Sequence, residues 1–340
     1  MSIRYRPMEP KDIRICAGII ARHPVYAPRY GEAIAHLGAA WQKLLGTDSF
    51  ISTVFEEVQD AKSTVLGAGI AVFVTDDFVH ELKTSPHFWI GPELVDRIIR
   101  GKSAILSDKE LREANSSGGL NVATWQCGVS PEDVARGDVG NTIMAAFVKL
   151  ISGFRIKEQV LQGESVEQMA AALSVGSFLW SATNGCYENF DAVPSEKLLK
   201  KHHVLGMSRD LASRFPGSWA ASTYLYTPPR FAFSRSEQRL LLCGLDGGTD
   251  EEIALKLNIS LAGVRKTWRM IYERMGTLEP ALALNQIEGN GRTAERGKEK
   301  KQRVLACVRD HPEELRPISR KLLREAIAHG SDSGRELNRT

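Results

Sequence analysis

The sequence predicts two parts of different fold class. Residues 1–183 are expected to form an α/β domain with a mixed sheet and helices, and residues 233–288 an all-α helix-turn-helix domain followed by a helical tail. Three observations support this prediction. Strand-like and helix-like patterns alternate along the first part. Proline and glycine recur over 184–232, which is typical of a connecting segment. From residue 233 onward the apolar residues recur at helical spacing.

The composition is that of an ordinary globular chain. Of the 340 residues, 43% are hydrophobic and 25% are charged, and 44 Lys and Arg oppose 41 Asp and Glu for a net charge of +3. This balance excludes disordered, collagen-like and histone-like proteins. The five cysteines are scattered without a CxxC pair, so neither a disulfide framework nor a zinc finger is predicted. The polar N-terminus and short apolar stretches predict no membrane segment, and we expect a cytoplasmic protein.

The first part alternates between short β-rich runs and amphipathic helical runs. Residues 51–58 and 64–74 are rich in β-branched side chains and flank a polar turn, which predicts a hairpin. The remaining predicted elements are strands at 3–7, 120–129 and 155–162 and helices at 12–21, 33–45, 141–151 and 166–173.

This order of elements, together with the opening IRYRPMEPKDIRICAGII, resembles the GNAT-type acetyltransferase fold over residues 1–180. The resemblance implies an acyl-CoA site between the strand at 120–129 and the next helix. The candidate cofactor-binding residues there are Arg136, Gly137 and Gly140, because glycines let backbone N–H groups approach a pyrophosphate. Two positions of the family's glycine pattern hold other residues. The sequence therefore predicts no cofactor, and acyl-CoA is disfavoured.

Residues 184–232 contain repeated proline and glycine and predict an irregular connection. The TPPR stretch at 227–230 predicts an extended linker, because a residue that precedes proline is pushed out of the helical region. We place the main domain boundary there.

Two capping boxes open the helical region. Ser234 and Glu237 form the first, Thr249 and Glu252 the second, and an apolar helical run follows each. A tight turn at 258–260 then separates the second helix from a third. Two short helices, a turn and a third helix predict a helix-turn-helix.

The third helix is predicted to begin at the capping residue Ser260 and to extend through Arg274. Its apolar residues recur at helical spacing and are expected in the core: Val264, Trp268, Ile271 and Met275. The opposite face carries three cations, which are suited to DNA phosphates and guanine edges: Arg265, Lys266 and Arg269.

Residues 233–276 resemble the LuxR-type DNA-binding domain and align with it without a gap. The matching positions are Phe233-Ser234, Glu237, Leu240-Leu241, Gly247, Glu252-Ile253-Ala254, Leu257, Ile259-Ser260, Val264-Arg265, Ile271-Tyr272 and Gly276. Leu261, Gly263, Thr267 and Trp268 depart from the family's usual residues. The resemblance implies that the third helix reads double-stranded DNA. It also implies that the chain forms a homodimer through a following helix, for which 281–287 is the candidate.

We expect the DNA contacts to come from the start of the second helix and from the third helix. The candidate residues are Thr249, Ser260, Arg265, Lys266, Thr267, Arg269 and Arg274.

The tail, residues 289–340, begins with a polar and basic stretch at 289–303. This stretch is interpreted as a solvated linker, with an arm that contacts phosphates as the alternative. Residues 303–309 and 316–329 are predicted to be helical, and the last residues are expected to fray.

Other candidate sites have simpler explanations. Asp76 and Asp77 are interpreted as the start of a helix and not as phosphate acceptors. His202 and His203, with Cys186, lack the spacing of metal ligands. The aromatic residues of the first part are interpreted as core, with a ligand cavity as the alternative. We predict neither a catalytic nor a metal site.

The predicted function is that of a DNA-binding transcriptional regulator whose N-terminal domain senses a small molecule or a partner. The alternative is an acyl-CoA-binding or acetyltransferase-like protein that carries a DNA-binding module. A third possibility is a first domain that only dimerises.

Overall fold

The structure is a computed structural model of the chain. It describes residues 2–60, 62–84, 88–134, 136–163, 178–181, 185–186, 204–217, 219–282 and 293–323. The chain divides into two compact units. Met1–Ile151 and Arg155–Leu225 form the first, which we call the α/β unit, and Ser152–Phe154 and Tyr226–Thr340 form the second, which we call the helical unit.

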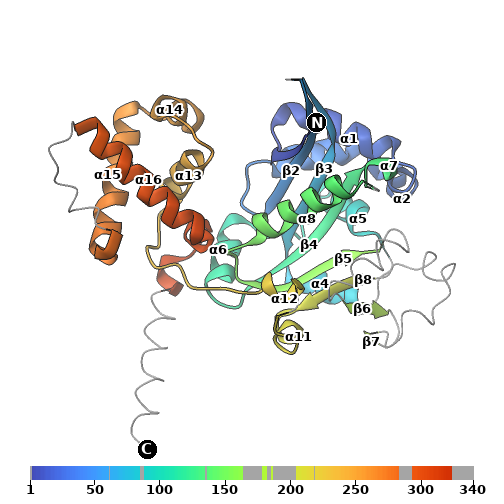
Figure 1. Ribbon diagram of the computed structural model, residues 1–340. Coiled ribbons are helices and arrows are strands. Elements are labelled where there is room, and N and C mark those ends of the chain that lie inside the picture. Colours follow the sequence, from blue (N-terminus) through green and yellow to red (C-terminus); the bar gives the residue numbers. More distant parts are fainter. Residues whose placement is uncertain are drawn as a thin grey trace, which may run out of the picture. The chain divides into compact units, whose positions relative to one another are not determined.

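The α/β unit is built on one mixed sheet (Figure 1). Among the described residues the strand order is β1-β2-β3-β4-β5-β8-β6-β7. Strands β4 and β5 are parallel, and every other neighbouring pair is antiparallel. The strands are β1 (Ser2–Pro7), β2 (Phe50–Gln59), β3 (Lys62–Val74), β4 (Leu120–Val129), β5 (Ile156–Gln162), β6 (Phe178–Ser181), β7 (Gly185–Cys186) and β8 (Val204–Ser208).

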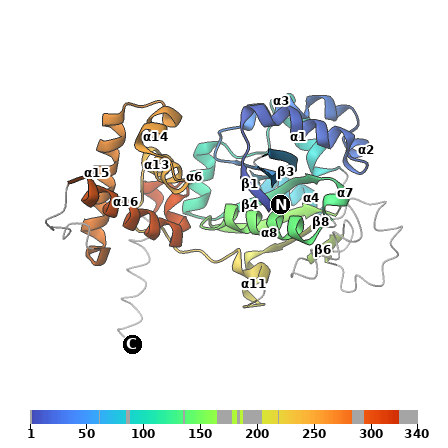
Figure 2. The same ribbon diagram turned by 45° about the horizontal axis from the view of Figure 1, so that its top comes forward.

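Helices cover both faces of this sheet (Figure 2). The helical segments of the unit are α1 (Pro10–Arg22), α2 (Tyr26–Tyr30), η1 (Gly31–His36), α3 (Leu37–Leu44), α4 (Asp76–Thr84), α5 (Ile90–Ile99), α6 (Asp108–Ser116), α7 (Pro131–Val134), α8 (Gly137–Ile151), α11 (Arg209–Ser213) and α12 (Trp219–Ser222).

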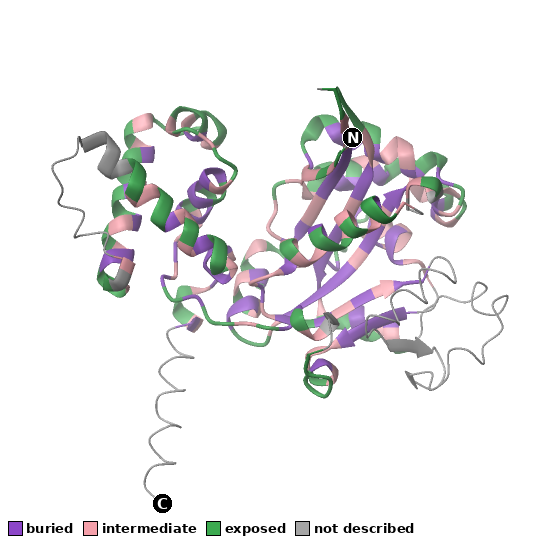
Figure 3. Cartoon of the chain, viewed as in Figure 1, coloured by how far each residue is buried: buried purple, intermediate pink, exposed green. Residues whose placement is uncertain are grey.

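Each face of the sheet has its own apolar core. On one face, residues of α1, α3, α4 and α5 pack with Val72, Ala123 and Val160 from the strands. On the other face, Val139 and Ala146 of α8 pack against strand residues that include Phe55 and Val129. Figure 3 shows the central strands as mostly buried. This burial on both faces explains why their sequences are nearly continuous apolar runs.

The mixed sheet with helices confirms the fold class predicted for the first part. All the strands predicted from the sequence are present, and the hairpin of β2 and β3 forms as expected. The helix predicted at 33–45 is divided into η1 and α3. The helix predicted at 166–173 lies outside the described residues.

The prediction that 184–232 is irregular throughout is wrong. Val204–Ser208 is strand β8, which lies between β5 and β6 and pairs with both. The residues of β5 that pair with it, Glu158 to Gln162, lie more than forty positions earlier in the chain. A five-residue strand held by such distant partners has no local pattern that distinguishes it from a loop.

The helical unit contains three helices in the predicted order and further segments after them. The segments are α13 (Arg235–Leu245), α14 (Asp250–Leu257), α15 (Leu261–Leu278), η3 (Pro280–Leu282), α16 (Thr293–Asp310) and η4 (Pro312–Leu315). Both predicted capping boxes form, with Ser234 at the start of α13 and Thr249 at the start of α14. The sequence therefore determined where these helices begin.

A single apolar core joins the helices of this unit. Leu240 and Leu241 of α13 meet Val264 and Ile271 of α15, and the buried Val304 of α16 belongs to the same cluster. The interpretation of 289–303 as a linker is thus wrong from Thr293 onward, because α16 begins there and its apolar face is needed to close the core.

Two other predictions about the tail are tested only in part. Of the candidate dimerisation helix at 281–287, residues 283–287 lie outside the described part, and η3 ends just before them. Of the helix predicted at 316–329, residues 320–323 are helical, residues 316–319 are not, and 324–329 lie outside the described part. Among the described helices, none combines the length and the apolar character that a membrane span needs.

Candidate functional site

The turn between α14 and α15 is defined by its backbone. Asn258 ends α14 in the left-handed conformation, with φ of 53°. Asn tolerates this region better than most residues, so the chain can reverse here without glycine. Two residues later the Ser260 hydroxyl accepts the N–H of Gly263 at 3.1 Å and begins α15. The three-residue turn therefore fixes the direction of α15.

α15 has one buried face and one exposed face. Trp268 is 4% exposed, and Val264, Ile271 and Met275 are fully buried beside it. The three cations predicted on the opposite face, Arg265, Lys266 and Arg269, are all exposed.

Within the described part of the chain these three cations form no ion pair. Several other cations of the unit do: Lys256 pairs with Asp246, Lys301 with Asp250 and Arg303 with Glu299. The outer face of α15 thus presents positive charge that no carboxylate among the described residues pairs with directly.

Three other predicted contact residues hold their own helices. The Thr249 hydroxyl accepts the N–H of Glu252 at 3.2 Å, and Ser260 caps α15 as described. The Thr267 hydroxyl donates to the Gly263 carbonyl at 2.9 Å. These hydroxyls have local roles that explain their presence without DNA.

Arg274, which was also predicted to contact DNA, is engaged within the helical unit. Its guanidinium donates to the Glu237 carboxylate at 2.7 Å and lies over the ring of Phe233. Burial raises the pKa of Glu237, but hydrogen bonds from the Ser234 backbone and hydroxyl and from Arg274 outweigh it and hold that pKa below its usual range. Arg274 therefore stabilises the end of α15 against the start of α13.

α16 contributes a contact that the sequence did not reveal. Lys301 pairs with Asp250 at 3.0 Å at the start of α14, and its ammonium lies 5.2 Å from the centre of the Trp268 ring. Tyr272 stacks on the same ring at 5.8 Å. Trp268, which departs from the LuxR-type pattern, is thus packed under α16. No signal in the sequence pairs residues 301 and 268, since they belong to separate helices.

The α/β unit contains a second candidate site, where β4 and β5 part. Their parallel pairing runs from Leu120 and Ile156 to Ala123 and Val160. Beyond these residues β5 pairs with β8, whereas the rest of β4 pairs with β3 among the described residues. The Cys127 carbonyl of β4 accepts instead from the Tyr26 hydroxyl at 2.9 Å. We call this divergence the β4–β5 wedge.

A bulge in β4 gathers polar groups beside the wedge. Ile70 pairs with Gln126 and the next residue of β3 pairs with Thr124, so Trp125 has no partner in the ladder. Such a bulge re-aims neighbouring side chains. The Tyr30 hydroxyl accepts from the Trp125 indole at 2.8 Å and donates to the side-chain amide oxygen of Gln126.

The side-chain N–H₂ group of Gln126 has no partner among the described residues. This group is buried. An unsatisfied buried donor costs free energy, and a functional site is one reason for keeping such a group.

Arg136, Gly137 and Gly140 do not fit a pyrophosphate. The Arg136 guanidinium lies 2.8 Å from Glu57, 3.0 Å from Asp138 and 3.4 Å from Asp133, so three carboxylates already surround this cation. The Gly140 N–H donates to the Arg136 carbonyl at 3.0 Å. An anion at this helix start would meet an excess of negative charge.

Of the remaining sequence candidates, the structure describes the surroundings of Asp76. Asp76 begins α4 as predicted and pairs with Lys157 at 2.7 Å. His202 and His203 lie outside the described residues. Among the residues that the structure does describe, no group of three or more metal-ligating side chains occurs.

The chain shows little similarity to known proteins. No family model matches it, and no curated protein matches it significantly. One similar solved structure is the GphF GNAT-like decarboxylase in complex with isobutyryl-CoA, with 14% sequence identity and a TM-score of 0.34. The match covers 60% of this chain and 98% of that chain. This likeness is too low to show a shared function, and the LuxR-type resemblance rests on the sequence of residues 233–276.

Proposed function

We propose that this chain is a DNA-binding regulator and that α15 enters the major groove of double-stranded DNA. One observation carries the proposal: the exposed face of α15 presents Arg265, Lys266 and Arg269 without carboxylate partners among the described residues, while its opposite face is fixed in the core. A rigid helix with unpaired cations on its outer face suits the negatively charged groove.

The three cations have different chemical roles in this proposal. Arginine offers a planar fork that matches the two acceptors of guanine, so Arg265 and Arg269 are assigned to base contacts. Lysine is a point charge, and Lys266 is assigned to phosphate. In this arrangement the start of α14, the first helix of the motif, lies beside the sugar-phosphate backbone of the DNA.

We further propose that the regulator binds as a homodimer. One recognition helix reads only a few base pairs, and two copies related by a two-fold axis would meet half-sites about 10 bp apart or a multiple of that. Light scattering of the complex tests this. A single copy on a site without repeats would overturn it.

The α/β unit is proposed to sense a small molecule at the β4–β5 wedge. The side-chain N–H₂ group of Gln126 would donate to an acceptor oxygen of that molecule. The surroundings of Arg136 do not favour acyl-CoA, so the acetyltransferase-like alternative has no support from its pyrophosphate residues. A thermal shift by acetyl-CoA of several degrees would reverse this assignment, since ligand at 100 times its dissociation constant adds about 2.7 kcal/mol.

The DNA proposal is tested by single substitutions on α15. Arg265→Ala should cost about 1–3 kcal/mol on the preferred site and blur the preference at one base position. Lys266→Ala should weaken binding to all sequences alike and reduce the salt slope by about one. The matched control is Arg309→Ala, an exposed cation at the far end of α16.

The measurement is a binding titration on preferred and scrambled DNA at two salt concentrations, with melting curves alongside. Trp268→Ala should instead lower the stability of the helical unit by about 3–5 kcal/mol, because Trp268 is a core residue. If the two α15 variants remain folded and bind both DNAs as the parent does, α15 does not read DNA.

A further inference from the structure

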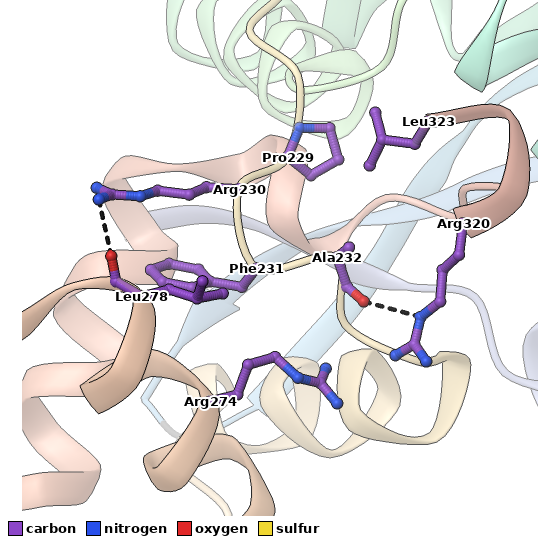
Figure 4. A pocket seen from close by; sticks show the side chains of 8 residues that line it. All are labelled: Pro229, Arg230, Phe231, Ala232, Arg274, Leu278, Arg320 and Leu323. Atoms are coloured by element: carbon purple, nitrogen blue, oxygen red, sulfur yellow. Dashed lines mark hydrogen bonds between the residues drawn. The ribbon is translucent and has the colours of Figure 1, made fainter. Parts of the chain in front are cut away.

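The helical unit contains a pocket of about 360 Å³ (Figure 4). Three stretches of chain supply its walls: the segment before α13, the last turns of α15, and the residues after η4. The lining residues are Pro229, Arg230, Phe231, Ala232, Arg274, Leu278, Arg320 and Leu323. Its volume lies within the range of small-molecule sites.

Part of the lining is apolar. Pro229, Phe231 and Leu323 are buried and belong to the body of the unit. Leu278 is 44% exposed, although it stands at the end of a helix whose other apolar residues are mostly buried. An exposed leucine at the edge of a concave apolar surface favours a ligand with an apolar body.

The rest of the lining is strongly basic. Arg274 and Arg320 approach Ala232 from opposite sides, as Figure 4 shows. Both contact one carboxylate, that of Glu237, at 2.7 and 3.5 Å. Arg230 contacts Glu279 and donates to the Leu278 carbonyl at 2.8 Å.

This arrangement gives the pocket a cationic lining with spare donors. Among the described residues no acidic side chain lines the pocket: Glu237 and Glu279 contact its guanidinium groups from outside the lining, and Glu314 is engaged by the backbone N–H groups of Arg230 and Phe231. Arg274 uses a single nitrogen in its described hydrogen bonds. A guanidinium has more N–H donors than these bonds engage, and such a fork matches a carboxylate in two parallel bonds.

We propose that this pocket binds a small organic acid: a monocarboxylate attached to an apolar body. The carboxylate would be held by Arg230, Arg274 and Arg320, and the apolar body would cover Phe231, Leu278 and Leu323. Guanidinium groups beside an apolar floor favour a carboxylate with an apolar body over a bare inorganic anion. Because Arg274 and Leu278 belong to α15, the bound acid would also hold the last turns of that helix.

This inference does not depend on DNA binding, so the test measures the acid alone. The probe is 4-phenylbutyrate, titrated into the full chain by calorimetry. Its neutral amide has nearly the same shape and serves as the matched ligand. We expect one acid per chain and binding of the amide that is weaker by about tenfold or more, because the guanidinium groups would lose their anionic partner.

Three variants locate the site. Arg230→Gln and Arg320→Gln should each weaken the acid by about tenfold, whereas Arg303→Gln, an exposed arginine on α16, should leave it unchanged. Leu278→Glu should keep the fold, because Leu278 is 44% exposed, and it places a negative charge at the rim. It should abolish acid binding while leaving the melting curve near that of the parent.

Three results would overturn the assignment. The acid could fail to bind, or the acid and the amide could bind equally well. Leu278→Glu could bind the acid as the parent does. Inorganic phosphate is titrated in parallel, and equal binding of phosphate would show a general anion site and not an organic-acid site.

Discussion

Glu314 holds the segment that leads into α13, and its replacement should loosen the whole helical unit. The side chain is 2% exposed. Its carboxylate accepts the backbone N–H of Phe231 at 3.0 Å and that of Arg230, and the N–H of Ala232 also points to it. Ala232 has φ of 48°, which turns these successive N–H groups toward one acceptor.

Two substitutions separate the acceptor from the charge. Glu314→Ala leaves up to three backbone N–H groups without an acceptor. Each unsatisfied donor costs about 1–3 kcal/mol of stability when it is buried, but water can reach the N–H groups on the side of the exposed Arg230. We therefore expect a loss of about 2–4 kcal/mol in the free energy of unfolding of the helical unit. Glu314→Gln keeps one oxygen and removes the buried charge, and should cost about 1 kcal/mol at neutral pH.

The difference between Glu314→Gln and the parent should depend on pH. Burial raises the pKa of Glu314 above its usual value. The native state then binds a proton that the unfolded state has already released, so this contribution to stability is complete below the unfolded pKa and is lost as pH rises through the folded one. The cost of Glu314→Gln should accordingly be larger near pH 4 than at pH 7.

Hydrogen exchange of peptides from α13 and α15 measures this stability without interference from the α/β unit. Glu314→Ala should speed exchange across both helices together. If those peptides exchange as in the parent, or if the Gln variant shows the opposite pH trend, then Glu314 does not support the unit in the way its contacts indicate.

Three further predictions concern the α/β unit. Burial raises the pKa of the Cys16 thiol to about 12, so iodoacetamide at pH 8 should leave Cys16 unlabelled in the folded chain; rapid labelling would refute this. Tyr30→Phe should lower stability by about 1–3 kcal/mol in a denaturant titration, because the buried indole of Trp125 loses its acceptor; an unchanged midpoint would count against it. Gly67→Ala should cost about 1–3 kcal/mol in the same titration, since a Cβ there would lie 1.9 Å from the Gly128 carbonyl, and a neutral result would mean that β3 and β4 can separate freely.

Local patterns in the sequence were enough to locate most elements of both units. The capping boxes at Ser234 and Thr249 need only residues three positions apart, and both form as predicted. The buried and exposed faces of α15 follow from helical spacing alone, so Trp268 and Arg265 are found on the predicted sides. Each of these features is determined by neighbours within about one helical turn.

The tertiary structure decided which cations are available and where a ligand could sit. Arg274 looks like Arg269 in the sequence, yet it bonds to Glu237, which lies 37 positions away. The Tyr30 and Gln126 side chains that meet beside the wedge are 96 positions apart. Strand β8 and helix α16 likewise depend on partners elsewhere in the chain. Such contacts arise when buried polar groups and apolar faces find partners on folding, and that pairing depends on three-dimensional proximity, which a local residue pattern does not encode.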